Sequence, residues 1–313
     1  MSDEDRFPTR GSRRSFLAAS ATVSGGLVGV AGCLATAGRV RVLAATSLTV
    51  ALEERLGPAF ESATGIRFDG EYHGTNAILR MIEEGRAHPD VIVGVDVSLL
   101  RDRLYPDFVD WDVEFATNEM VIAYAADTEL GARLESDEPW YDVLADAEEG
   151  AIGISDPDRS PVGYRALQLF ELAEREHDLE GFYDATVERV QVDAGEGQVL
   201  GGVDAGTRSC AVVYRNMAAD RDLPVRELPD AYNFGDPDTE YARASYTTTE
   251  GRTIAGSPIV YNASVRNGAD GEDGGERFVS HLLENPDGLE KSGLRTPTPL
   301  PRGHGDVPGR VLP

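Results

Sequence analysis

The sequence predicts an α/β protein of two similar units with a ligand site between them. Three observations carry this prediction. From residue 40 onward, short apolar runs alternate with amphipathic helical patterns; one longer apolar run interrupts the alternation, which then starts again; and a late strand pattern precedes a last helical pattern. Alternating strands and helices form mostly parallel sheets covered by helices on both faces. The late strand and helix suggest that the chain finally returns to its first unit.

The first unit begins with an apolar strand over residues 40–44, followed by a helix that carries Leu48, Leu52 and Leu56 on one face. The run "IRFDGEY" alternates as a second strand, "AILRMIEEG" is helical, and "PDVIVGVD" is a fully apolar third strand. This βαβαβ order predicts a parallel sheet. The run "EFATNEMVIAYA" that follows is predicted as one longer strand.

The second unit repeats the same order, with "GAIGISDP" as a strand, "GYRALQLFELAEREH" as a helix and "CAVVYRN" as a strand. The strand "SPIVYNASV" and the helix "GERFVSHLLENPDGLEKSG" come last. Cys210, in the apolar strand, is expected to be a small core residue. We divide the chain into a linker (34–39), a first lobe (40–120), a second lobe (121–264) and a return to the first lobe (265–313).

The composition excludes some partners. Apolar residues make up 41% of the chain, so a sizeable core is possible, and the formal charge is −26, from 55 Asp and Glu against 29 Lys and Arg. Because the negative charge is spread along the chain, nucleic acid and anionic membrane surfaces are unfavourable partners. An acidic, solvated surface of this kind indicates a halophilic host.

The N-terminus reads as a targeting segment. Arg13-Arg14 precedes Ser15, Phe16, Leu17 and a mildly apolar run that ends at Cys33. A twin arginine before such a run is typical of export of a folded protein, and the residues around Cys33 resemble a lipobox. A transmembrane anchor is the alternative, but the run is short and rich in Gly, Ser and Thr. We therefore interpret 1–33 as a twin-arginine lipoprotein signal, which would leave the protein lipid-anchored outside the membrane.

Small polar residues follow three of the predicted strands and precede helices. They are Thr46 and Ser47, then Gly74, Thr75 and Asn76, and finally Ser160 to Gly163. Helix N-termini carry unsatisfied N–H groups and partial positive charge, so they bind anions, although such residues are also ordinary helix caps. No lysine lies in these loops, and Arg159 and Arg165 are expected to point outward. The sequence thus predicts a small anion held by neutral dipoles.

Catalytic and cofactor signatures are not found in the sequence. No G-x-S-x-G motif surrounds Ser47, the five histidines are scattered without metal-ligand spacing, and no phosphate-binding loop or dinucleotide fingerprint occurs. We therefore expect no enzyme, no cofactor and no bound metal other than that of an oxyanion ligand.

Several segments resemble one protein family. "WDVEFATNEMVIAYA" closely resembles the hinge stretch of archaeal tungstate/molybdate-binding lipoproteins, the substrate receptors of ABC importers. "SDPDRSPVGYRAL", "VVYRNMA", "RELPDAYNFGDP" and "GSPIVYN" are similar to the same family in the same order, and "AATSL" resembles the serine loop of molybdate receptors. The resemblance implies a type II periplasmic-binding fold of two lobes joined by two crossing strands. It also implies capture of molybdate or tungstate by a monomer that delivers it to an ABC permease and its ATPase.

The resemblance also assigns oxyanion-binding residues. Ser47 and Thr75 match hydroxyl and backbone donors of the first lobe, Val162 matches a backbone donor, and Tyr214 matches a phenol donor. Ser160 stands where the family usually has an aspartate, and Glu227 matches the second of the two carboxylates that bring the metal towards six-coordination. Because Ser160 replaces one carboxylate, we favour a site that holds only the four oxygens.

Two alternatives stay open. One is a receptor for another oxyanion such as sulfate; phosphate is disfavoured because a protonated anion needs an acceptor, which the matched donors do not supply. The other is an exported serine hydrolase that uses Ser47 or Ser160. The sequence does not rank molybdate against tungstate.

Overall fold

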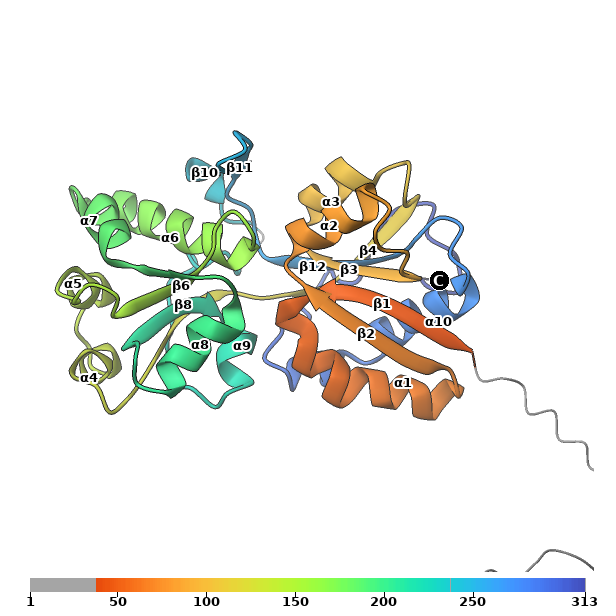
Figure 1. The fold of residues 1–313 in the computed structure, drawn as a ribbon, viewed down its shortest axis with the longest axis horizontal. Helices are drawn as coiled ribbons and strands as arrows, with labels where there is room; N and C mark the ends of the chain where they lie inside the picture. The colour runs from red at the N-terminus through yellow and green to blue at the C-terminus, as the bar shows by residue number, and fades with distance from the viewer. Residues whose placement is uncertain (1–37, 237, 313) are drawn as a thin grey trace, which may run out of the picture. The chain divides into compact units, whose positions relative to one another are not determined.

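The computed structural model describes residues 38–236 and 238–312. The expected signal segment with Cys33, and residues 34–37 of the expected linker, lie outside the described residues. Two separate sheets, each flanked by helices, form two lobes (Figure 1). No helix in the described part is long and apolar enough to cross a membrane.

The first lobe contains a six-stranded sheet in the order β13-β4-β12-β3-β1-β2. Strand β1 pairs in parallel with β2 and β3, whereas β12 pairs antiparallel with β3 and β4. All five residues of β3 are buried, as expected for an apolar central strand. The strands are β1 (Arg39–Ala45), β2 (Arg67–His73), β3 (Val91–Val95), β4 (Trp111–Thr117), β12 (Val260–Val265) and β13 (Arg302–Gly305).

The second lobe contains a five-stranded sheet in the order β7-β6-β8-β5-β9. Strand β6 pairs in parallel with β7 and β8, and β5 pairs antiparallel with β8. Cys210 is fully buried in β8, and burial raises the pKa of its thiol to about 12, so it is an inert core residue as predicted. The strands are β5 (Met120–Tyr124), β6 (Ile152–Ser155), β7 (Gln191–Asp193), β8 (Cys210–Tyr214) and β9 (Val225–Arg226).

Helices cover both faces of each sheet (Figure 1). Those of the first lobe are a 3₁₀ turn η1 (Thr46–Leu48), a π-helical segment η2 (Ala51–Leu56), α1 (Gly57–Thr64), α2 (Thr75–Glu83), α3 (Val97–Leu104), α10 (Glu272–Glu284) and α11 (Pro286–Glu290). Those of the second lobe are α4 (Glu129–Glu135), α5 (Trp140–Ala145), α6 (Pro161–His177), α7 (Phe182–Arg189), α8 (Glu196–Asp204) and α9 (Arg215–Ala219). A 3₁₀ turn η3 (Tyr241–Arg243) precedes a hairpin of β10 (Ser245–Thr247) and β11 (Thr253–Ala255).

The expected single strand over "EFATNEMVIAYA" is wrong. It is two strands in different sheets, β4 and β5, separated by Asn118 and Glu119. The backbone N–H of Glu119 donates to Asn118 Oδ1 (2.9 Å), Asn118 Nδ2 donates to the buried Asn216 Oδ1 (2.7 Å), and the Glu119 carboxylate pairs with Arg215. The chain passes from the first sheet to the second here and passes back between β11 and β12 (Figure 1).

The C-terminal segment returns to the first lobe, as the late helical pattern suggests. Helix α10 packs on β1 and β12, and the buried Asp90 carboxylate fixes its start. Asp90 accepts hydrogen bonds from the Arg41 backbone (2.8 Å), the Arg41 guanidinium (2.9 Å) and the Gly271 N–H (3.0 Å). Burial raises the pKa of Asp90, but these hydrogen bonds outweigh it and lower the pKa overall.

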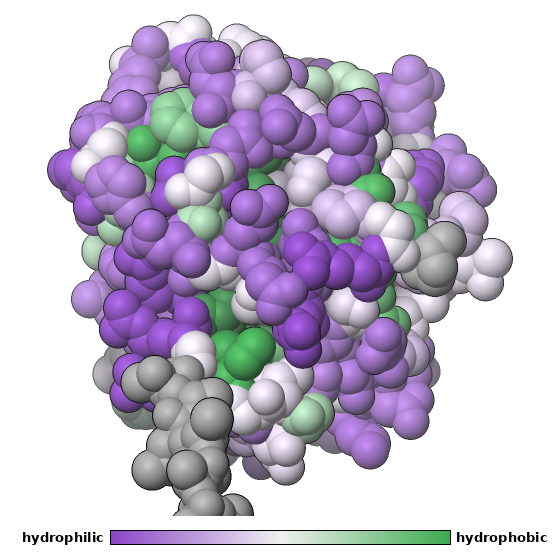
Figure 2. Space-filling model, turned by 90° about the vertical axis from the view of Figure 1, so that its right-hand side faces the viewer, coloured by the Kyte–Doolittle hydropathy of each residue, from purple (hydrophilic) through white to green (hydrophobic). Residues whose placement is uncertain are grey.

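The surface of the first lobe is mostly hydrophilic on the face shown in Figure 2. Among the described residues, Val192 is the only exposed large hydrophobic side chain. This surface agrees with the strongly acidic composition. It offers no large exposed apolar patch on which a partner could bind.

Candidate functional site

The two hydroxyl residues expected to bind an anion in the first lobe lie at one edge of its sheet. Ser47 is in η1, directly after β1, and Thr75 is the first residue of α2, directly after β2. Because β1 and β2 are parallel and Ala45 pairs with His73, both loops leave the sheet at the same edge. Both side chains are buried, and Thr75 Oγ1 accepts from the Val95 N–H at 3.3 Å.

A buried hydrogen-bond relay orients the Ser47 hydroxyl. Ser47 Oγ lies 3.0 Å from Tyr261 Oη, and Asn118 Nδ2 donates to the same Tyr261 oxygen at 3.1 Å. Asn216 Nδ2 donates to the Ser47 carbonyl at 2.5 Å. Burial raises the pKa of Tyr261 to about 12, so the phenol keeps its proton and can donate it to Ser47. Either oxygen can be the donor in this bond, and in the arrangement in which Tyr261 donates, the Ser47 proton is free for a ligand.

Ser160 and Val162 form the predicted helix start in the second lobe. Ser160 is the N-cap of α6, and its Oγ accepts from the Val162 N–H at 3.2 Å. The Ser160 hydroxyl donates to the buried Glu196 carboxylate at the start of α8. The Val162 N–H is therefore already engaged within the loop. The sequence analysis missed Glu196, because Gly195, Gly197 and two later glycines weaken the helical pattern of α8.

Tyr214 and the charged Arg165 form a buried pair in the second lobe. Tyr214 ends β8, is fully buried, and accepts a 2.7 Å hydrogen bond from Arg165 Nη1. The expectation that Arg165 points outward is wrong: its side chain is completely buried, on the side of α6 that packs against the sheet, whereas Arg159 is exposed. Burial favours the neutral form of Arg165, but neighbouring Tyr214, Tyr164 and Asp96 raise its pKa overall. The site therefore does not consist of neutral dipoles alone.

Asp96 links the two lobes at this point. It follows β3 in the first lobe, and its Oδ2 accepts from the Tyr164 hydroxyl of α6 at 2.8 Å and lies 3.5 Å from Arg165 Nη2. Its φ of +88° is unusual for an aspartate, and its Oδ1 caps α3 through the Leu99 N–H at 3.2 Å. Strained backbone of this kind is often found at functional sites. The sequence analysis did not single out Asp96, although an aspartate directly after an apolar strand is a signal that could have found it.

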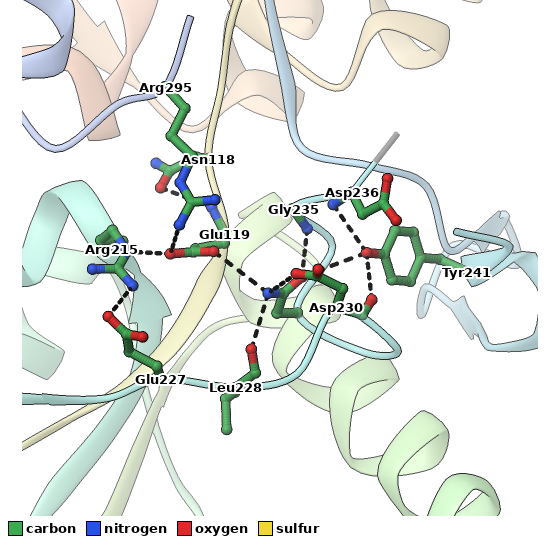
Figure 3. Close-up of polar contacts among 11 residues, drawn as sticks. Asn118, Glu119, Arg215, Glu227, Leu228, Asp230, Gly235, Asp236, Tyr241 and Arg295 are labelled. Atoms are coloured by element: carbon green, nitrogen blue, oxygen red, sulfur yellow. Dashed lines mark hydrogen bonds and ion pairs between the residues drawn. The ribbon is translucent and has the colours of Figure 1, made fainter. Parts of the chain in front are cut away.

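Glu227 lies apart from the other five assigned residues. Its side chain is 72% exposed and pairs with Arg215 Nη2 at 2.7 Å (Figure 3), which holds the pKa of the carboxyl below its usual range. The structure places the other five in a set of separate hydrogen-bonded groups: Ser47 with Tyr261, Thr75 with the Val95 N–H, Tyr214 with Arg165, and Ser160 with Val162 and Glu196. It gives Glu227 no contact with that set.

A hollow of about 440 Å³ opens beside these loops, with walls from both lobes. A Cβ built on Gly74 would lie 2.6 Å from the Arg159 carbonyl oxygen, so the backbones of the two lobes are in close contact there. The hollow is lined by Thr46, Tyr72, His73, Gly74, Ala77, Arg159, Ser160 and residues 194–198. Of the six assigned residues, Ser160 lines this hollow, whereas Ser47, Thr75, Val162, Tyr214 and Glu227 do not.

The chemistry of this arrangement fits binding better than catalysis. It combines hydroxyl and phenol donors with one guanidinium, which are groups that hold anions. Neither Ser47 nor Ser160 makes a hydrogen bond to a histidine within residues 38–236 and 238–312. The described residues also contain no group of three or more His, Cys, Asp or Glu suited to a metal ion.

Comparisons with known proteins give the family. The bacterial extracellular solute-binding protein family matches residues 40–295. An uncharacterized solute-binding protein of Halobacterium salinarum is 42% identical over 95% of this chain and 96% of that protein. A putative ABC transporter molybdenum-binding protein of Haloferax volcanii is 38% identical over 96% of each chain.

The fold comparison agrees with these relatives. The periplasmic molybdate-binding protein of Azotobacter vinelandii has a TM-score of 0.59 with 18% identity, over 83% of this chain and all of that one. The predicted two-lobed type II periplasmic-binding fold is thereby confirmed. The chain belongs to the family of bacterial extracellular solute-binding proteins, the substrate-binding components of ABC transporters.

Proposed function

We propose that this receptor captures molybdate or tungstate outside the cell and delivers it to an ABC permease and its ATPase. The observation that carries the proposal is the buried set of donors contributed by both lobes: Ser47 and Thr75 from one, Tyr214 and Arg165 from the other. A small tetrahedral dianion suits such convergent donors. The names of the molybdenum-binding relative and of the molybdate-binding structural neighbour support this choice.

In this proposal Ser47, Thr75 and Tyr214 contact the oxyanion through their side chains, whereas the Val162 N–H stays bonded to Ser160 Oγ. Ser160 holds the loop through its bonds to Val162 and Glu196. Glu227 stays outside the site, which favours recognition of the four oxygens without carboxylate coordination of the metal. Closure of the lobes over the anion produces the form that docks on the permease. The family is a class of transport proteins, and we propose that the protein catalyses no reaction.

Other oxyanions are the rivals to test. Sulfate has the same charge and shape as molybdate and is smaller. Monohydrogen phosphate is kept among the rivals because the structure supplies an acceptor that the sequence analysis did not, the buried Glu196 carboxylate beside Ser160.

Titration of the full-length protein with four anions tests the function. We expect molybdate and tungstate to raise the melting temperature at equal concentration, and sulfate and phosphate to do little.

Ser47→Ala removes a hydroxyl donor to a charged ligand, so calorimetry should show roughly tenfold to hundredfold weaker binding of tungstate. A response to sulfate equal to that for molybdate would assign a sulfate receptor, a dominant phosphate response would implicate Glu196, and no response to any of the four would contradict the function.

We further propose that the chain is exported by the twin-arginine route as a monomer and is held to the membrane by a lipid on Cys33. A lipid chain adds roughly 0.8 kcal/mol of membrane affinity for each buried methylene. Cys33→Ser should therefore move the protein from the detergent phase to the aqueous phase without changing its melting temperature. If wild type and variant both partition into water, the lipid anchor is excluded.

A further inference from the structure

Arg165 is a buried cation with few close partners. Its guanidinium has five N–H donors and no exposed surface. Only Nη1 has a short hydrogen bond, 2.7 Å to Tyr214 Oη; Nη2 lies 3.5 Å from both Asp96 Oδ2 and Ser257 Oγ, and Nε has no partner among the described residues. Burying a charge with so little compensation is costly unless another group completes its interactions.

The nearest carboxylate, Asp96, does not complete them. Its short contacts go to other groups: Tyr164 Oη at 2.8 Å, Ser98 Oγ at 2.8 Å and the Leu99 N–H at 3.2 Å. These donors occupy both carboxylate oxygens, so Asp96 offers Arg165 a negative charge at 3.5 Å but no short hydrogen bond. Arg165 therefore keeps unused N–H donors at the point where the two lobes meet, while Asp96 at 3.5 Å and the Tyr164 ring at 5.4 Å offset only part of its charge.

We propose that Arg165 contacts the bound oxyanion directly and that its charge makes the site prefer dianions to monoanions of the same shape. This inference rests on the proposed function and extends it to the basis of selectivity. The hydrogen bond from Nη1 places the guanidinium beside Tyr214, a phenol assigned to the ligand. Because Tyr214 Oη accepts from Arg165, its own proton is free to bind the same anion. The Coulomb energy of a fixed cation doubles when the ligand charge doubles, so tungstate gains more than perrhenate, a tetrahedral monoanion.

A charge-balanced variant tests this inference without leaving a buried charge unpaired. Arg165→Gln alone would strand Asp96, so it is combined with Asp96→Asn, which removes the charge, keeps one of the two acceptor oxygens and tolerates the left-handed backbone. The reference is Asp96→Asn alone. Arg175→Gln, on the exposed end of the same helix and paired with Glu171, is the control. Each full-length protein is titrated with tungstate and with perrhenate by calorimetry.

We expect the double variant to bind tungstate at least about a hundredfold more weakly than Asp96→Asn, and perrhenate only about tenfold more weakly. The tungstate-to-perrhenate affinity ratio should therefore fall about tenfold, while Arg175→Gln keeps both affinities. Arg165→Lys, which keeps the charge, should keep the ratio near that of wild type. A ratio that is unchanged in the double variant, whether both affinities fall or neither does, would overturn the inference and leave Arg165 a structural residue. Wild-type protein that binds neither tungstate nor molybdate would instead overturn the proposed function.

Discussion

Replacing Gly74 with alanine is expected to weaken tungstate binding by roughly tenfold to a hundredfold and to leave the unliganded protein as stable as wild type. Gly74 has φ −61° and ψ 141°, a backbone conformation open to any residue, so the substitution causes no local strain. The added Cβ would lie 2.6 Å from the Arg159 carbonyl oxygen of the other lobe. That oxygen belongs to a turn held by the Arg159 N–H bond to Asp156 (3.1 Å), so it cannot move aside cheaply. The clash is relieved only when the lobes separate. The substitution should therefore destabilise the closed, anion-bound form and leave the open, unliganded form unaffected.

The measurement is the tungstate-induced rise in melting temperature, together with the melting temperature of the unliganded protein. Gly201→Ala, which adds the same methyl group to open space on α8, is the control and should keep wild-type affinity. If Gly74→Ala binds tungstate as tightly as wild type, the close approach at Gly74 is not needed in the bound form. A fall in the stability of the unliganded protein by more than about 1 kcal/mol would show that the closed contact already exists without ligand.

The places of the Ser47 and Thr75 loops in the fold were predictable from the sequence because they follow from strand ends. Ser47 and Thr75 come directly after β1 and β2, which the apolar patterns located to within one or two residues. Parallel strands place such ends at one edge of a sheet, so the loops had to meet. Ser160 was predictable for another reason, since a serine before a proline is a strong signal for a helix start.

Arg165 could not be placed by the same reasoning. An arginine in the second turn of a helix is usually exposed, and nothing in "PVGYRAL" distinguishes the buried Arg165 from the exposed Arg159 nearby. Its burial depends on Tyr214 and Asp96, which are 49 and 69 residues away along the chain. Glu196 was missed because it lies in a glycine-rich helix, and its pairing with Ser160 is likewise a long-range contact.

The break between β4 and β5 was also missed because it depends on long-range contacts. Seven residues of β4 and five of β5 are all buried, so the hydrophobic pattern runs on through the crossing point. Only Asn118 and Glu119 mark the change of sheet, and a polar pair inside a strand pattern is ambiguous without its partners. Figure 3 shows the partners of Glu119, among them Arg215 of the second lobe and Arg295 of the C-terminal return.

Glu119 is expected to be the residue on which the crossing depends most. Its buried carboxylate pairs with Arg215 Nε of α9 and with Arg295 Nη2 at 2.9 Å, and its second oxygen lies 3.4 Å from Asn233 Nδ2 (Figure 3). Arg295 also bridges to Thr117 at the end of β4 through backbone hydrogen bonds. One carboxylate therefore joins the crossing segment to both lobes.

Glu119→Gln should lower the free energy of unfolding by about 2–3 kcal/mol, less than the cost of breaking a fully buried ion pair because Arg295 is about half exposed. The expected fall in melting temperature is roughly 3–5 °C. Glu227→Gln is the matched control: it removes the other partner of Arg215, but Glu227 is 72% exposed, so the cost should stay below about 1 kcal/mol. Raising the salt concentration should screen the exposed Arg215–Glu227 pair and leave the cost at Glu119 nearly unchanged. Equal effects of the two substitutions, or an effect at Glu119 that salt removes, would show that its ion pairs are solvated and that the crossing segment is held by its backbone contacts instead.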